Sequence, residues 1–448
     1  MIKLFKRTIL YFRKHGIKKT IRRMLGILFG KLYRDITFLL KEYPKQEKHY
    51  NTICKKLKEK IRTKQKIRVA FMVIYDEIFY AKRIFEKMLN DDIFDPSIII
   101  APDVCRGKEN MLYQLEKSYQ AYTALYDKEV FRGYEKENDQ YIDYSNSFDI
   151  FCFCNPYDNM THAFFQVDYI RTKDALTFYL EYFHIGVFYY GLLHVIPLPT
   201  MSLFWKIFTE SNISFNEYKI NQIIRGKNVF VSGFYGYDEY NVLKKTVHQR
   251  KCIIIAPHHT IGKENKDTLE LSNFLEYAGF FLELPRIYAD IDFIFRPHPL
   301  LVPRLKRDDI WGVEKTNSWL DNLLTNRNVT YSKGGDFYEL FINSDAIIHD
   351  CGSFTLEYLF TGYPCCYILK KNKPLKTVFT KFGIRCLDQY YHAYNKDDII
   401  SFLDNVVLKN IDPLKNKREG FARKYLYQNH STTEKIIDEV KRAIINVK

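Results

Sequence analysis

Two short polar stretches of this sequence carry residue types that bind phosphate groups in proteins. Arg296 and His298 lie in the first stretch, and Gly352, Ser353 and Thr355 lie in the second. Guanidinium and imidazole groups donate hydrogen bonds to phosphate oxygens, and the free N–H groups of a glycine turn before a helix do the same. Taken singly, Arg296 could be a surface ion-pair residue and His298 a turn residue. The two stretches together favour a diphosphate site.

The elements around these stretches are predicted to bring them to one place. Residues 292–295 and 346–348 are short apolar runs, which are typical of buried parallel strands. After the second run, a polar turn, a helix over 354–360 and a further apolar run at 365–369 complete a βαβ unit. The loops after parallel strands lie at the same edge of a sheet, so the two polar stretches are expected to meet there.

Both stretches are also similar to motifs of a known enzyme family. The pattern RPHP, followed by SDAIIHDCGS and EYL, resembles the C-terminal half of the CDP-glycerol glycerophosphotransferase family, GT-B enzymes of teichoic-acid and capsule synthesis. The resemblance spans residues 66–410 and is most specific at 293–299 and 344–364. It implies that the diphosphate and the glycerol of the donor are held by Arg296, His298, Asp350, Gly352, Ser353, Thr355 and Glu357.

Two features of the second motif leave its interpretation open. Gly352 stands where a first serine is common in the family, so the identity of the donor is not settled by the motif. Glu357 lies one turn into the predicted helix, where its carboxylate could accept hydrogen bonds from ribose or glycerol hydroxyls. It could equally be an ordinary acid that complements the helix macrodipole.

A third polar stretch, His258, His259 and Thr260, follows the apolar run 252–256. Adjacent histidines on one loop rarely point at the same ion, and no carboxylate or thiolate cluster accompanies them. We therefore expect these residues to donate hydrogen bonds to the substrate, and we expect neither a metal nor another cofactor. The family resembles this stretch as well.

Transfer to an acceptor hydroxyl also requires a base whose pKa lies near the working pH. His184 follows a predicted strand and lies in the sequence FHIG, and the larger polymerases of the resembling family have a His-Gly motif in the same domain. We expect His184 to be the catalytic base and His298 to stabilise the charge of the transition state. His162 and Asp158 are the reserve candidates for the base, and each of these residues could instead be structural.

Length and composition favour two folded domains. The chain has 448 residues, 46% of them hydrophobic and 16% aromatic, which excludes wholesale disorder. Nine cysteines are scattered without a C-x-x-C pair, which favours reduced thiols over a disulfide framework. The net charge of +15 arises in residues 1–65, where twenty Lys and Arg face four acids, whereas the remainder holds 48 basic and 49 acidic residues. The expected domains are therefore nearly neutral.

The basic segment 1–65 is predicted to form amphipathic helices that lie on an anionic membrane. Apolar residues recur at spacings of three and four between the basic ones, as in 2–12 and 17–28. No uncharged run approaches the roughly 18 residues needed to span a bilayer, and charges interrupt every candidate signal-peptide core. The alternative is a basic helix that docks on its own protein.

The remaining chain is expected to form an α/β protein with the GT-B fold, two Rossmann-like parallel-sheet domains that face a cleft. We expect an N-terminal acceptor domain over 66–228, a donor-nucleotide domain over 229–410 with a hinge near Gly233, and helices over 411–448 that pack back on the N-terminal domain. Within the first domain, residues 203–218 are predicted to form one helix with Trp205 and Phe208 inward.

The resemblance implies transfer of glycerol phosphate, or a related polyol phosphate, from CDP-glycerol or another nucleotide-activated donor to a lipid-linked cell-surface glycan or teichoic-acid-like acceptor. CMP would be released, and the protein would lie at the inner face of the cell membrane as a cytoplasmic, peripheral protein and a possible homo-oligomer. The alternatives are a GT-B glycosyltransferase that uses a nucleotide sugar and a non-catalytic scaffold of envelope synthesis. Nucleic-acid binding is disfavoured because the basic segment lacks interleaved aromatic stacking platforms.

Overall fold

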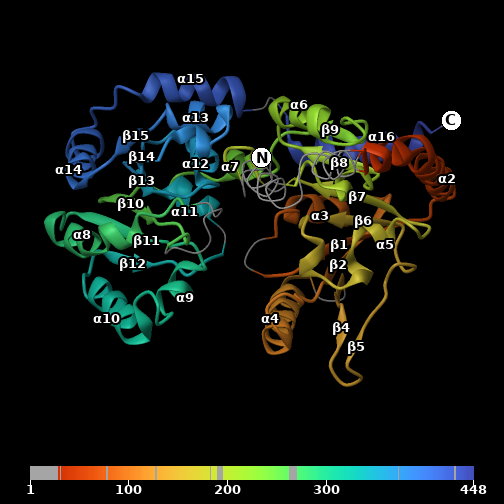
Figure 1. Ribbon diagram of the computed structural model, residues 1–448, viewed down its shortest axis with the longest axis horizontal. Helices are drawn as coiled ribbons and strands as arrows, with labels where there is room; N and C mark the ends of the chain where they lie inside the picture. Colours follow the sequence, from red (N-terminus) through yellow and green to blue (C-terminus); the bar gives the residue numbers. More distant parts are fainter. Residues whose placement is uncertain are drawn as a thin grey trace, which may run out of the picture.

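Two α/β domains, each built around a parallel sheet, make up the protein (Figure 1). The computed structural model describes residues 29–30, 32–76, 79–126, 129–181, 183–188, 195–261, 270–335, 337–371, 373–427 and 430–447. The first domain lies on the right of Figure 1 and the second on the left. The prediction of two parallel-sheet domains is confirmed.

The first sheet has the strand order β3-β2-β1-β6-β7-β8-β9, and all its pairs are parallel. In the central strand β1 every residue except Arg68 is buried, as expected for a parallel sheet covered on both faces. A short antiparallel pair, β4 (Tyr134–Glu135) and β5 (Gln140–Tyr141), extends from this domain. The sheet strands are β1 (Ile67–Val73), β2 (Phe94–Ile100), β3 (Val130–Arg132), β6 (Ile150–Phe153), β7 (Leu176–Leu180), β8 (Lys206–Thr209) and β9 (Val229–Val231).

Helices cover both faces of the first sheet and bury two apolar clusters against it. The α-helices between residues 43 and 221 are α2 (Tyr43–Arg62), α3 (Lys82–Leu89), α4 (Lys108–Tyr126), α5 (Val167–Ile170) and α6 (Asn212–Asn221).

The second sheet has the order β12-β11-β10-β13-β14-β15 and is also parallel throughout. Its strands are β10 (Lys251–Ala256), β11 (Ile291–Phe295), β12 (Val329–Tyr331), β13 (Ala346–His349), β14 (Cys365–Ile368) and β15 (Tyr391–Ala393). The helices of this half are α7 (Tyr237–Val242), α8 (Phe274–Ile287), α9 (Leu301–Leu305), α10 (Gly312–Leu324), α11 (Tyr338–Asn343), α12 (Phe354–Glu357), α13 (Lys381–Leu387) and α14 (Lys396–Ser401).

The predicted helix over 203–218 is wrong. β8 is a buried strand between β7 and β9, and α6 begins only after Ser211, whose hydroxyl accepts the N–H of Ser214 at 3.2 Å. The sequence of β8, Lys-Ile-Phe-Thr, holds β-branched and aromatic residues that fit a buried strand. The spacing of Trp205 and Phe208 suits a helix, but pairing of β8 with β7 and β9 decides the conformation here.

The predicted domain boundary at residue 229 also needs correction. β9 pairs in parallel with β8, so the first sheet continues to Val231 and the chain leaves the domain after it. Gly233, where we placed the hinge, has a φ of +102°, a conformation that residues with a Cβ rarely adopt. The segment that crosses from the first domain to the second therefore begins at Gly233.

The C-terminal helices divide between the two domains. α15 (Lys415–Tyr425) packs on the second domain, where Phe421 and Ala422 join the core, so the expectation that all of 411–448 returns to the first domain is wrong. α16 (Thr432–Ile445) does lie on the first domain, beside α2 (Figure 1). The carboxylate of Asp238 accepts the N–H groups of Thr432 and Thr433 at 3.0 and 2.7 Å, which fixes the start of α16.

The expected N-terminal segment is described from residue 29 onward, and the amphipathic helices predicted within residues 1–28 lie outside the described residues. α2 packs into the first domain through buried Tyr50, Ile53 and Leu57, and the hydroxyl of Tyr50 donates to the carbonyl of Leu203 at 2.6 Å. In the part of the chain that the structure describes, no helix has both the length and the apolar composition to cross a bilayer.

The loop after β7 forms a second connection between the domains. The N–H of Phe188 donates to the carbonyl of Val378 at 2.7 Å, and the N–H of Thr380 donates to the carbonyl of Gly186 at 3.0 Å. The hydroxyl of Thr380 donates to the carbonyl of Ile185 at 2.7 Å. Main-chain hydrogen bonds therefore join the two domains at this junction.

The close approach at this junction predicts a specific stability defect. A Cβ at Gly383 would lie 1.9 Å from the carbonyl oxygen of Gly186, so Gly383→Ala must push the two segments apart. We expect this variant to lower the free energy of unfolding by about 1–3 kcal/mol in urea titrations. Gly420→Ala, in α15, is the control, because a Cβ there meets nothing within 4 Å and is expected to be neutral or slightly stabilising. Equal stability of the two variants would contradict the packing described here.

Candidate functional site

Three polar loops meet at one edge of the second sheet. β10 pairs with β11 on one side and with β13 on the other, and all three strands run in the same direction. Their carboxyl ends carry residues 257–260, 296–298 and 350–353. The predicted stretches are therefore neighbours in space, at the sheet edge where ligands of open α/β proteins bind.

Asp350 fastens these loops to one another. Its buried carboxylate accepts the N–H groups of His258 and Asn273, both at 2.6 Å, and burial raises its pKa to about 7. Asn273 precedes α8, so a single side chain connects the ends of β10 and β13 to the start of that helix. The geometry gives Asp350 a role in holding the loops, whereas we expected it to bind the substrate directly.

The rings of His258, His259 and His298 form one cluster. The ring centroids of His259 and His298 are 4.0 Å apart, and those of His258 and His298 are 5.2 Å apart. One ligand atom from each ring lies within 4.8 Å of the others, so the spacing alone would allow a metal ion. The hydrogen bonds of the rings decide what the cluster can bind.

Two of the rings carry their proton on Nε2. Nδ1 of His298 accepts the N–H of Leu300 at 3.1 Å. The hydroxyl of Thr260 accepts the N–H groups of Leu271 and Ser272, so its own proton goes to Nδ1 of His258 at 2.9 Å. A neutral ring whose Nδ1 accepts a hydrogen bond has an Nε2–H and no lone pair there for a metal. The cluster therefore supplies hydrogen-bond donors and suits an anion better than a cation.

Burial keeps these rings neutral. It lowers the pKa of His259 to about 4 and that of His298 to about 3, and nearby Arg304 adds to both shifts. The guanidinium of Arg304 donates to the carbonyl of His259 at 3.1 Å, which places a cation beside the cluster. The donors are thus uncharged at neutral pH, and the positive charge comes from arginine.

Arg296 is buried and anchored at the same edge. Its guanidinium donates to the hydroxyl of Ser332 at 2.7 Å and to the carbonyls of Gly334 and Gly335 at 3.1 and 2.5 Å. Its charge acts on Glu357, where it partly offsets the rise in pKa caused by burial. Arg296 therefore holds the loop 332–335 in addition to the phosphate role expected for it.

Glu357 is a buried carboxyl at the junction of the domains. Burial raises its pKa to about 8, and no hydrogen bond to its carboxylate comes from the described residues. Tyr80 of the first domain packs edge-on against Tyr235, with ring centroids 5.8 Å apart, and the charge of Glu357 adds to the effect of burial in raising the pKa of both phenols. Sequence reasoning missed these two tyrosines.

Of the two hydroxyl side chains at the start of α12, one is exposed to solvent and one is buried. Ser353 is exposed, whereas Thr355 is buried and donates to the carbonyl of Cys351 at 2.9 Å. We had expected Thr355 to bind the substrate, but its buried hydroxyl is used within the turn and stabilises it. Gly352 lies against Val187 of the first domain, where a Cβ would be 3.3 Å from its methyl groups, so the turn faces the junction of the domains.

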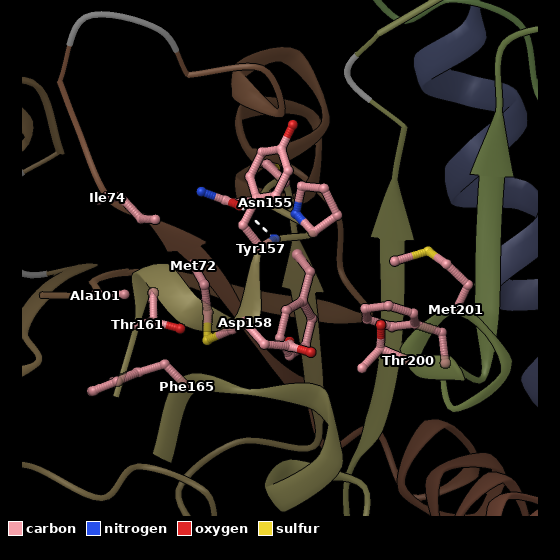
Figure 2. Close-up of a pocket in the computed structure, with 14 residues that line it drawn as sticks. Met72, Ile74, Ala101, Asn155, Tyr157, Asp158, Thr161, Phe165, Thr200 and Met201 are labelled. Carbon is pink, nitrogen blue, oxygen red and sulfur yellow. Dashed lines mark hydrogen bonds between the residues drawn. The ribbon is translucent and has the colours of Figure 1, made fainter. Parts of the chain in front are cut away.

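The first domain contributes a narrow hollow at the ends of β1, β2 and β6, with a volume of about 20 Å³, room for about one water molecule. Figure 2 shows Asp158 and Thr200 extending into it between the apolar side chains of Met72, Phe165 and Met201. Burial, with a contribution from Asp168, raises the pKa of Asp158. The buried hydroxyl of Thr200 has no hydrogen-bond partner among the described residues. The hollow can thus hold one small polar group.

The predicted bases occupy different environments. The side chain of His184 is 5% exposed and packs beside the stacked rings of Phe234 and Phe360, at centroid distances of 4.3 and 5.8 Å. Burial lowers its pKa to about 4, although the carboxylate of Glu210 acts in the opposite direction. His162 stacks on Tyr141 at 4.0 Å, which indicates a packing role.

Solved structures with a similar fold include enzymes that bind nucleotides. A variant of the wall teichoic acid polymerase TagF soaked with CDPG is 12% identical, with a TM-score of 0.53 over 93% of this chain and 97% of that one. The S. aureus MnaA–UDP structure is 11% identical, with a TM-score of 0.53 over 85% and 98%. The UDP-GlcNAc 2-epimerase of Neisseria meningitidis bound to UDP-GlcNAc is 12% identical, with a TM-score of 0.50 over 84% and 100%.

No family model and no curated protein matches the sequence. At these identities the similarity establishes the architecture, and the chain has the GT-B fold that we predicted.

The buried carboxyl of Glu357 predicts a pH-dependent stability difference. Its folded pKa of about 8 lies above its usual value of 4.5, so the folded protein keeps a proton that the unfolded chain releases, and stability falls as the pH rises through this range. Glu357→Gln cannot ionise. Its stability advantage over the wild type is expected to grow from pH 5 to pH 8, to on the order of 3 kcal/mol in urea unfolding.

The exposed Glu276, changed to Gln, is the control for this experiment and is expected to give the same pH dependence as the wild type. A Glu357→Gln advantage that is constant or shrinks with pH would show that the carboxyl is ionised in the folded protein.

Proposed function

We propose that this protein transfers glycerol phosphate, or a related polyol phosphate, from a CDP-activated donor to a membrane-linked glycan or teichoic-acid-like acceptor, and releases CMP. The observation that carries the proposal is the meeting of three strand-end loops, 257–260, 296–298 and 350–353, at one edge of the second sheet. These loops place neutral N–H donors, an exposed serine hydroxyl and the charge of Arg296 around one edge of the sheet.

This set of groups suits a phosphoryl transfer. The transition state spreads negative charge over the equatorial oxygens of the phosphoryl group, and preorganised donors in a buried site stabilise such charge strongly. His258 and His298 supply Nε2–H groups, and Arg296 and Arg304 supply positive charge. Glu357, whose charge acts on Tyr80 and which is itself acted on by Arg296, would accept a hydrogen bond from a hydroxyl of the donor.

The first domain supplies acceptor-side candidates. Asp158 in the hollow of Figure 2 and His184 at the junction are the groups that could take the proton of the attacking hydroxyl. Both follow strands of the first sheet at its carboxyl edge. Donor binding by one domain and acceptor binding by the other fits the two different sets of polar groups.

A GT-B glycosyltransferase that uses a nucleotide sugar is the second candidate. Gly352 removes a hydroxyl that the resembling family often has, and two of the structures with a similar fold contain UDP or UDP-GlcNAc. The nucleotide released distinguishes the two candidates. Incubation with CDP-glycerol, CDP-ribitol, UDP-sugars and GDP-sugars is expected to release CMP, whereas release of UDP or GDP alone would establish the glycosyltransferase.

The polar groups at the ends of β10, β11 and β13, here called the cradle, predict which side chains the transfer reaction needs. His298→Ala removes an N–H donor and Ser353→Ala removes the exposed hydroxyl, and each is expected to lower kcat by about 100-fold or more. Both variants should keep their thermal midpoint within a few degrees, because the hydrogen bond that His298 accepts from the N–H of Leu300 lies at an exposed turn and the Ser353 hydroxyl makes none within the described residues. His248→Ala, at an exposed position, is the control. Full activity of either cradle variant in a nucleotide-release assay would show that the cradle is assigned to the wrong residues.

We also propose that the N-terminal segment contacts an anionic membrane surface. The described part of this segment exposes a row of apolar side chains before α2: Phe29, Leu32, Tyr33, Ile36 and Leu40. The segment 1–65 carries an excess of sixteen basic residues, which would add electrostatic attraction to anionic headgroups.

Deletion of residues 1–42 tests this contact without removing α2, whose buried side chains belong to the first domain. The truncated protein is expected to stay folded and to lose co-sedimentation with phosphatidylglycerol vesicles. Binding of the full chain should weaken with salt and be small on phosphatidylcholine. Unchanged sedimentation of the truncated protein would assign the membrane contact elsewhere.

A further inference from the structure

A second polar cluster lies inside the first domain, where β7 and β8 end. Glu181 follows β7 and is 1% exposed, and Glu210 follows β8 and is 8% exposed. Buried carboxyl groups are uncommon unless they are hydrogen-bonded and share charge with a partner. Their hydrogen bonds therefore indicate which of the two is ionised.

The two carboxyls are joined by one hydroxyl. Thr209 contacts Oε2 of Glu181 by a short hydrogen bond and Oε2 of Glu210 at 2.9 Å. A hydroxyl has one proton, so it can donate to only one of them. The other carboxyl must then carry a proton of its own and donate it to the threonine oxygen. The pair is consequently one acid and one carboxylate.

The remaining partners assign the proton to Glu181. Glu210 also accepts hydrogen bonds from the hydroxyls of Ser211, at 3.1 Å, and Ser214. Glu181 has one further donor, the hydroxyl of Tyr218 at 3.2 Å. Burial, together with the charge of Glu210, raises the pKa of Glu181 well above its usual range. Three hydroxyl donors stabilise the negative charge on Glu210.

The ionised carboxylate faces His184. Oε1 of Glu210 lies 3.8 Å from Nδ1 of the imidazole, and Nε2 is buried without a hydrogen-bond partner among the described residues. The neighbouring rings of Phe234 and Phe360 are uncharged, and within the described chain Glu210 is the charged group that acts on this ring. A buried imidazole nitrogen without a partner indicates a group that a ligand would complete.

We propose that Glu210 is the positioning residue of His184: the charge of its carboxylate, 3.8 Å from Nδ1, favours the tautomer with the proton on Nδ1 and leaves the lone pair of Nε2 for an acceptor hydroxyl, while protonated Glu181 keeps the negative charge on Glu210. This inference rests on the proposed function in one respect, the use of His184 as the base. No sequence motif singled out Glu181 or Glu210. The inference gives this buried pair control over the tautomer of His184.

In the proposed reaction, one bond to phosphorus forms and one breaks, and the proton of the acceptor moves to His184. The acceptor hydroxyl gives its proton to Nε2 of His184, and its oxygen bonds to the phosphorus that carries the polyol. The bond between that phosphorus and the bridging oxygen breaks, and the oxygen leaves with the electron pair as part of CMP. The imidazolium formed is stabilised by Glu210 until it releases its proton to water.

Two isosteric variants at neighbouring buried positions separate this role from packing. In Glu210→Gln the charge that faces Nδ1 is lost. In Glu181→Gln the amide can donate to Thr209 as the protonated acid does, so the charge on Glu210 stays. Glu210→Asp keeps a carboxylate and serves as the conservative rescue.

The tautomer of His184 is read from ¹⁵N chemical shifts of the full-length protein labelled at histidine, with His184→Ala to assign the signal. We expect the Nδ1–H form in the wild type, in Glu181→Gln and in Glu210→Asp, and a shift toward Nε2–H in Glu210→Gln. In the nucleotide-release assay, Glu210→Gln should lower kcat by about 100-fold and change its pH profile, with the KM of the donor unchanged. Glu181→Gln should stay within a few-fold of the wild type.

A His184 tautomer and a pH profile that are the same in Glu210→Gln and the wild type would overturn the proposal, as would equal losses in the two glutamine variants. The tautomer measurement needs no substrate. If no donor gives transfer but the tautomer still changes only in Glu210→Gln, the proposed function fails and the positioning role stands.

Discussion

Parallel pairing of β10 with β11 on one side and β13 on the other is the constraint on which the candidate site depends. Strands that run in the same direction send their loops to one edge, so polar residues far apart in the chain become neighbours. Asp350 then converts this proximity into a fixed geometry. Its buried carboxylate binds the backbone of a loop from the adjacent strand, in surroundings of low dielectric where such hydrogen bonds are strong. The histidine cluster is positioned by a residue of a different strand.

The two domains contribute different sets of polar groups to the candidate site. The second domain supplies hydrogen-bond donors and arginine charge, whereas the first supplies the carboxyls of Asp158, Glu181 and Glu210. In the proposed reaction, the donors and arginines would stabilise the phosphoryl group, whereas His184, oriented by Glu210, would take the proton of the attacking hydroxyl. This complementarity would be lost if either set of groups lay on the other sheet.

Most strands, and the meeting of the polar stretches that follow them, could be predicted from the sequence because buried parallel strands are short apolar runs and polar residues follow them directly. The roles of single side chains could not. Thr355 and Asp350 have suitable chemistry, but their orientation toward Cys351, His258 and Asn273 depends on packing that spacing does not encode. The chain has 35 tyrosines, so nothing in the sequence distinguished Tyr80 and Tyr235 from the rest. The helix predicted over 203–218 failed because strand pairing with β7 and β9 decides the conformation there.

The return of α16 to the first domain has a consequence for biosynthesis. Ile436, Ile437, Val440 and Ile444 are part of the same apolar cluster as β1, which is made more than three hundred residues earlier. As the ribosome releases the chain from its N-terminus, the first domain lacks one wall of its interior while the second is already complete in sequence. Final consolidation of the earlier domain therefore waits for α16 to emerge, and a chain interrupted before this helix would leave that domain with an open apolar surface.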